Sequence, residues 1–188
     1  MMTRFRLTYQ RYEEIKKVVI AKLQEWGIDR LPFDCFLLCE KLGIVLKKYY
    51  DQDSITLQNL LARSEDAFCF VAVNDEGYSY FTIVYNDHKP KHRIRFSIMH
   101  EIGHIVLDHS EHSTLAETEA NFFAQYMLVP IPILQYHQPL SSPKISSLYN
   151  ISEECANNIL IQYRNWKEKG CPELFPYEAS LLRYFYYL

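Results

Sequence analysis

The chain has 188 residues, a formal net charge of −3 and 48% hydrophobic residues. This length suits one domain with a substantial core. The acidic balance speaks against direct nucleic-acid binding, which usually shows as a basic excess. No apolar stretch approaches the roughly 20 residues that cross a bilayer. Since residues 1–10 also lack the apolar segment of a signal peptide, we expect a cytoplasmic protein without a membrane partner.

The first half of the chain mixes helical and extended patterns. Apolar residues at helical spacing predict a helix over residues 8–26, and a second helix is expected from Pro32 to Gly43. Strands are predicted at residues 44–50, 67–73 and 78–85, with a short helix around 55–61. The segment Asn74-Asp75-Glu76-Gly77 has the composition of a hairpin turn between the last two strands.

The five cysteines do not resemble a disulfide framework. They are odd in number and scattered: Cys35, Cys39, Cys69, Cys155 and Cys171. Cys35 and Cys39 are four residues apart on a predicted helix, but no second pair of Cys or His residues lies near them in the sequence. We therefore expect both to be small buried hydrophobic side chains rather than metal ligands.

From Pro90 onwards the pattern is helical. Helices are predicted at residues 90–108, 114–129, 144–149 and 152–169. The first of these carries apolar residues nearly all round, which is typical of a buried, central helix. The aromatic tail that ends at Leu188 is interpreted as either an amphipathic helix that closes the core or a surface for a partner.

The central predicted helix contains His100-Glu101-Ile102-Gly103-His104. Residues four apart lie on the same face of a helix, so the two imidazoles can bind one divalent metal ion. Glu101, about 100° further round, can act on a water at that ion. A buried pair of histidines is costly unless it is bonded or coordinated, which supports the metal interpretation.

The third ligand is expected from the next helix. Asp108 is excluded, because eight residues of helix span roughly 12 Å while ligand atoms lie about 2 Å from the metal. Glu119 lies in the middle of that helix's apolar stripe, whereas Glu117 points the opposite way, so Glu119 is the predicted ligand. The alternative for Glu119 is a buried salt bridge to Arg93 or Arg95.

A site with two histidines, one glutamate and an open position is typical of catalytic zinc. Water there loses a proton more easily and attacks a carbonyl that the metal polarises, with Glu101 as the base that passes the proton to the leaving amine. This chemistry is peptide-bond hydrolysis. His109, His112 and Tyr126 are near enough in the sequence to be candidates for orienting the imidazoles, but a surface or packing role is the favoured interpretation for each.

Two segments in this order resemble the ImmA/IrrE family of zinc peptidases. The stretch from Arg93 to Leu107 is similar to the family's active-site helix, and Glu119-Ala-Asn-Phe-Phe-Ala followed by Met127-Leu-Val-Pro is similar to its second signature. The strand that ends Ile-Val-Tyr-Asn86 is also similar. The resemblance covers roughly residues 8–168 and implies His100, His104 and Glu119 as ligands of one zinc ion, with Glu101 as the catalytic base.

The resemblance also implies a substrate. Members of this family cleave a helix-turn-helix transcriptional repressor and so relieve repression, and the length of this chain is similar to the compact type found on mobile genetic elements. The segment from Ile145 to Trp166 is itself suggestive of a helix-turn-helix. Because it carries few basic residues, a docking surface for the repressor or plain core packing is the favoured interpretation over DNA binding.

Together these observations predict one α+β domain with a zincin-like core. We expect a small, largely antiparallel sheet packed on a central active-site helix, with a catalytic core at about residues 8–136 and a helical extension at about 137–188. The predicted function is a zinc-dependent endopeptidase (a gluzincin-like enzyme) with an anti-repressor role. Two alternatives are a catalytically silent, metal-bound module that sequesters the repressor, and a DNA-binding regulator with structural zinc.

Overall fold

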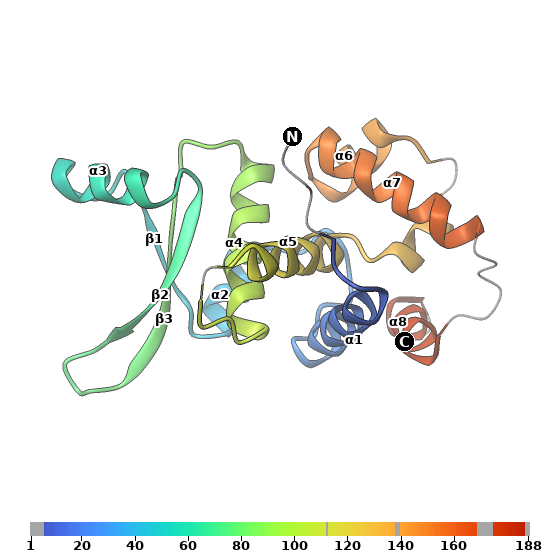
Figure 1. The fold of residues 1–188 in the computed structure, drawn as a ribbon, viewed down its shortest axis with the longest axis horizontal. Coiled ribbons are helices and arrows are strands. Elements are labelled where there is room, and N and C mark those ends of the chain that lie inside the picture. The colour runs from blue at the N-terminus through green and yellow to red at the C-terminus, as the bar shows by residue number, and fades with distance from the viewer. Residues whose placement is uncertain (1–5, 112, 138–139, 169–174, 187–188) are drawn as a thin grey trace.

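The computed structural model describes residues 6–111, 113–137, 140–168 and 175–186. It confirms an α+β fold in which most elements are helices (Figure 1). In chain order the elements are α1 (Tyr9–Glu25), α2 (Cys35–Lys41), β1 (Val45–Lys48), α3 (Ser54–Arg63), β2 (Ala67–Val73), β3 (Ser79–Tyr85), α4 (Lys91–Val106), α5 (Thr114–Leu128), the 3-10 helix η1 (Ile131–Tyr136), α6 (Ser142–Tyr149), α7 (Glu153–Glu168) and α8 (Pro176–Tyr186).

The sheet is small and mixed, in the order β1-β3-β2. Strands β2 and β3 form an antiparallel hairpin that pairs from Ala67 with Tyr85 to Val73 with Ser79. Strand β1 is parallel to β3 over a shorter register. The predicted turn is present: Asn74 Oδ1 accepts hydrogen bonds from the backbone N–H groups of Glu76 and Tyr78. The expectation of a largely antiparallel sheet is therefore confirmed, with one parallel strand added.

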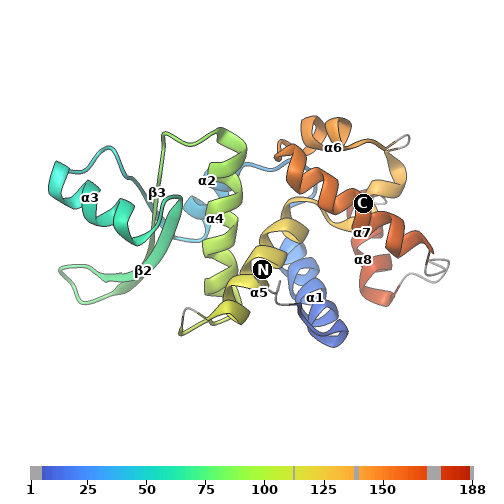
Figure 2. The same cartoon turned by 45° about the horizontal axis from the view of Figure 1, so that its top comes forward.

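Helix α4 lies at the centre of the molecule, between the sheet and α5. It contacts β2 and β3 on one side and α5 on the other (Figures 1 and 2). Its buried apolar side chains, Ile98, Met99 and Ile102, belong to the main hydrophobic core. The predicted central position of the helix that carries the histidines is thus confirmed.

Helix α5 is covered on two faces, because it packs against α1 as well as α4. The rings of Tyr12 on α1 and Phe122 on α5 meet edge to face, with centroids 4.7 Å apart. At its start, the Ser113 hydroxyl caps α5 by accepting a hydrogen bond from the N–H of Ala116. This cap fixes the first turn of α5 beside the second half of α4.

The C-terminal helices pack as a second helical group beside α1 and α4. The guanidinium of Arg95 on α4 is buried and donates hydrogen bonds to the carbonyl oxygens of Tyr149 (2.8 Å) and Asn150 (2.7 Å). These two residues lie at the end of α6, where the chain turns into α7. Helix α8 contacts α1 and buries Leu181 and Leu182. The described part of the aromatic tail is therefore an amphipathic helix that closes the core, while residues 187 and 188 lie outside the described ranges.

Two smaller predictions have clear outcomes. Helix α2 begins at Cys35 rather than Pro32, because the Asp34 carboxylate caps it by accepting from the N–H groups of Phe36 and Leu37. Cys35 and Cys39 are fully buried, and burial raises the pKa of their thiols to about 11 and about 12. Their role as packing residues is confirmed; Cys171 lies outside the described ranges. No described helix is both long and apolar enough to cross a bilayer.

Candidate metal centre

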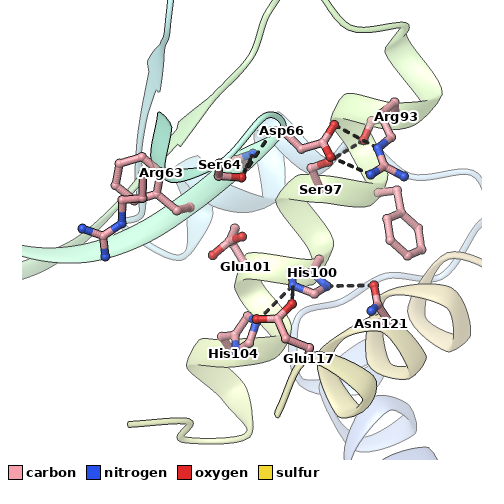
Figure 3. Close-up of a pocket in the computed structure, with 13 residues that line it drawn as sticks. Arg63, Ser64, Asp66, Arg93, Ser97, His100, Glu101, His104, Glu117 and Asn121 are labelled. Carbon is pink, nitrogen blue, oxygen red and sulfur yellow. Dashed lines mark hydrogen bonds and ion pairs between the residues drawn. The ribbon is translucent and has the colours of Figure 1, made fainter. Parts of the chain in front are cut away.

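The two motif histidines project from one face of α4. The Nε2 atoms of His100 and His104 are 3.0 Å apart, and the motif glutamate, Glu101, is buried next to them. Figure 3 shows Glu101 on the side of His100 that faces Ser64, whereas both imidazoles face α5. The helical-face argument for the histidine pair is therefore confirmed by the geometry.

Gly103 lets α5 come close to this part of α4. A Cβ atom on Gly103 would lie 3.0 Å from Cδ1 of Phe123 and 3.3 Å from backbone atoms of Ala120. These distances are tighter than ordinary van der Waals contacts. The glycine inside the motif thus sets the spacing between the helix that carries the histidines and the helix that faces them.

Glu117, in the first turn of α5, is the carboxylate that meets the imidazoles. Its Oε2 lies 3.3 Å from His100 Nε2 and its Oε1 lies 3.4 Å from His104 Nε2 (Figure 3). One ligand atom from each of the three residues falls within 4.8 Å of the others. Zinc–ligand bonds of about 2.0–2.1 Å at tetrahedral angles place ligand atoms about 3.3 Å apart. The spacings of 3.0 Å between the two Nε2 atoms and of 3.3 and 3.4 Å from the two Glu117 oxygens are close to this value, so the donor set fits zinc.

The prediction that Glu117 points away from the histidines is wrong. Glu119 is buried in the apolar stripe, as expected, but its carboxylate is bound by Arg11 and His109 rather than placed beside the Nε2 atoms. The alternative of a buried salt bridge is closer to the structure, although the partner is Arg11 and not Arg93 or Arg95. The Arg11 guanidinium holds the pKa of Glu119 below its ordinary value through hydrogen bonds.

The reason for this correction is the position of α5 between two helices. Glu117 and Glu119 are about 200° apart around α5. A helix with one buried face would allow only one of them inward, but α5 has α4 on one side and α1 on another. Each carboxylate therefore has a neighbouring helix to meet.

Both imidazoles are held through their second ring nitrogen. Asn121 Oδ1 lies 3.1 Å from Nδ1 of His100, and Nδ1 of His109 lies 3.0 Å from Nδ1 of His104. His109 thus contacts a motif imidazole, although a surface or packing role was the favoured expectation for it. Asn121 was missed, although its spacing of four residues from Glu117 places both on one face of α5.

The other two candidates for orienting the imidazoles have different outcomes. Tyr126 is fully buried against Phe122, and burial together with nearby Glu178 raises its pKa. It is therefore a packing residue on the side of α5 away from the histidines. His112 lies outside the described ranges.

The three ligand candidates and Glu101 border a pocket of about 620 Å³ between α4, the start of β2 and the start of α5. The wall opposite the histidines contains the ion pair of Arg93 with Asp66, joined by hydrogen bonds of 2.6 and 3.0 Å. Hydrogen bonds from Arg93 hold the pKa of Asp66 below its ordinary value. Next to them, the Arg63 guanidinium lies 4.5 Å from the ring centroid of Phe68. The pocket has the volume of a ligand-binding cleft.

A family model described as the IrrE N-terminal-like domain, Peptidase M78, matches residues 39–160. The matched range contains the sheet, α4, α5 and all residues of the site described so far except Arg11. A search of curated proteins gives no match.

Proposed function

Because the chain belongs to the IrrE N-terminal-like family and is a metallopeptidase of the ImmA/IrrE type, we propose that it is a zinc endopeptidase. Its proposed substrate is a helix-turn-helix transcriptional repressor, whose cleavage in the cytoplasm relieves repression of a mobile genetic element. The observation that carries the zinc assignment is the convergence of His100, His104 and Glu117 within 4.8 Å, beside the pocket that contains Glu101.

The chemistry divides between the metal and Glu101. His100, His104 and Glu117 would hold the zinc ion, which would supply a more acidic water and a Lewis acid for the substrate carbonyl. Glu101 accepts a proton as the water oxygen adds to the carbonyl carbon, and then donates it to the amide nitrogen as the C–N bond breaks. The close packing of α4 against α5 at Gly103 holds His100 and His104 opposite Glu117.

The sheet suggests how a peptide lies in the pocket. In the order β1-β3-β2, the outer edge of β2 has no strand partner among the described residues. The first residues of β2, Ala67 and Phe68, line the pocket together with Glu101 and the histidines. An extended peptide can pair its backbone with such an edge. This arrangement supports a protein substrate with a locally unfolded segment at the cleavage site.

Incubation with a helix-turn-helix repressor, taken from the neighbouring gene, tests the proposal. The wild-type protein with one zinc per chain should give two defined fragments by mass spectrometry. Glu101→Gln should cleave about 10²–10⁴-fold more slowly, because the proton acceptor is lost, and should keep its zinc.

Three results would contradict parts of this proposal. Equal cleavage by Glu101→Gln would remove Glu101 as the base. Binding of the repressor by the wild-type protein without fragments would indicate the non-catalytic, repressor-binding module instead. Tight duplex DNA binding that weakens steeply with salt would indicate a DNA-binding regulator.

A further inference from the structure

A continuous line of polar contacts runs from His104 to helix α1. His109 Nδ1 lies 3.0 Å from His104 Nδ1, and His109 Nε2 lies 3.0 Å from Glu119 Oε2. The Arg11 guanidinium then grips Glu119 with two hydrogen bonds of 2.7 Å, one from Nε to Oε1 and one from Nη2 to Oε2. Four side chains from α1, α4, the α4–α5 connection and α5 are thereby joined.

The proton positions along this line follow from the ligand role of His104. Its Nε2 faces His100 and Glu117, so a metal ligand there leaves the proton on Nδ1. His109 then accepts at Nδ1 and carries its own proton on Nε2, which it donates to Glu119. The carboxylate accepts from His109 and twice from Arg11, so every donor along the line has an acceptor.

The line is buried and held in place at its far end. The side chains of His109 and Glu119 are only 9% and 5% exposed. A buried carboxylate without a cation is costly, so Arg11 compensates the charge that His109 needs as an acceptor. Arg11 itself stands in the first turn of α1, where the Thr8 hydroxyl accepts from its backbone N–H and Glu14 accepts from Nη1.

We propose that Arg11, Glu119 and His109 are positioning residues of the metal centre, which orient the His104 imidazole so that Nε2 faces the metal. This inference rests on the proposed metallopeptidase function. It makes α1, which lies before the family match at residues 39–160, a working part of the site. Partners of this kind typically change metal affinity by about 10–100-fold.

Zinc affinity measured by competition with a chromophoric chelator tests the proposal. His109→Leu, Glu119→Gln and Arg11→Met should each weaken zinc binding by about 10–100-fold. Because the three residues act through one imidazole, the double variant of Arg11→Met and Glu119→Gln should be weakened less than the sum of the two single effects. With cobalt in place of zinc, the same variants should change the visible absorption spectrum.

A control on the same helix separates positioning from folding. Lys22→Met removes the salt bridge to Glu25 (2.8 Å) at the other end of α1 and should leave zinc affinity unchanged. All affinities are measured well below the unfolding temperature of each metal-free variant. Arg11→Lys keeps the charge but loses the bidentate hydrogen bonding to Glu119. Its zinc affinity should lie between those of the wild-type protein and Arg11→Met.

The outcomes separate the competing explanations. A wild-type protein that binds no zinc would overturn the proposed metallopeptidase site itself. Zinc binding by the wild-type protein with unchanged affinity and cobalt spectra in all three variants would overturn the positioning role alone. Loss of zinc in Glu119→Gln with unchanged affinity in His109→Leu would also overturn it, and would indicate that Glu119 is a direct ligand.

Discussion

Helix α5 carries a glutamate on each of two faces, and the surroundings of these two side chains are opposite in character. Towards α4, the side chain of Glu117 is 46% exposed and borders the pocket next to two imidazoles. Towards α1, Glu119 is buried and already neutralised by Arg11. A carboxylate that must bind a metal and leave a coordination position open needs access to the pocket. A carboxylate at the centre of an apolar stripe needs a permanent partner. In this helix the deeply buried glutamate, Glu119, is therefore the one that supports the metal centre rather than the one that binds the metal.

The largest change in zinc affinity is expected when each of the two carboxylates is removed in turn. Glu117→Ala should lose more zinc affinity than the roughly 10–100-fold expected for Glu119→Gln, since it removes a ligand rather than a partner of one. Zinc content after gel filtration and chelator competition measure the difference. If Glu119→Gln lost zinc and Glu117→Ala retained it, Glu119 would be the metal ligand and Glu117 would not.

Widening the gap between α4 and α5 should weaken both the stability of the protein and its binding of zinc. Gly103→Val places branched carbons where even a Cβ lies 3.0 Å from Phe123, and should destabilise the protein by about 1–3 kcal/mol. Because Glu117 is on the α4 side, zinc affinity should fall as well. Denaturant unfolding of the metal-free protein and zinc competition measure the two effects. Unchanged stability would show that α5 can shift at no cost.

The smallest effect is expected at the exposed counterpart of the Arg11–Glu119 pair. Arg93 and Asp66 make a similar two-pronged contact, but the Arg93 side chain is 51% exposed, so Arg93→Met should cost about 0.2–1 kcal/mol at neutral pH. The pKa of Asp66 is lowered in the folded state, so its stabilising contribution is present above the pKa of the unfolded chain, about 3.9, and is lost as pH falls through the lower folded value. Unfolding of wild type and variant at pH 7 and at pH 2–3 should show the difference shrink on acidification.

Much of this architecture could be predicted from local patterns. The apolar periodicity of residues 8–26 and 114–129 predicted α1 and α5 within one or two residues, and the spacing of His100 and His104 predicted their common face. The inward position of Glu119 was also predicted correctly. These successes share a cause, since each depends on the geometry of a single element.

What could not be predicted depends on which elements meet. A face calculation for α5 gives the angle between Glu117 and Glu119 but not the identity of the helix that each one faces. The contact that decides the role of Glu119 joins it to a residue 108 positions away, Arg11. No periodicity in α1 distinguishes Arg11 from the other charged residues of that helix, so this pairing becomes visible only in three dimensions.

The position of Arg11 has a practical consequence for dissecting the protein. A fragment cut to the boundaries of the family match, residues 39–160, would keep every ligand candidate and Glu101. It would lose Arg11, whose guanidinium neutralises Glu119. It would also leave the α1-facing surface of α5, including Phe122, open to water. The smallest fragment expected to keep a fully supported metal centre is therefore longer than the range that matches the family model, and fragments intended for inhibitor screening should begin before Thr8.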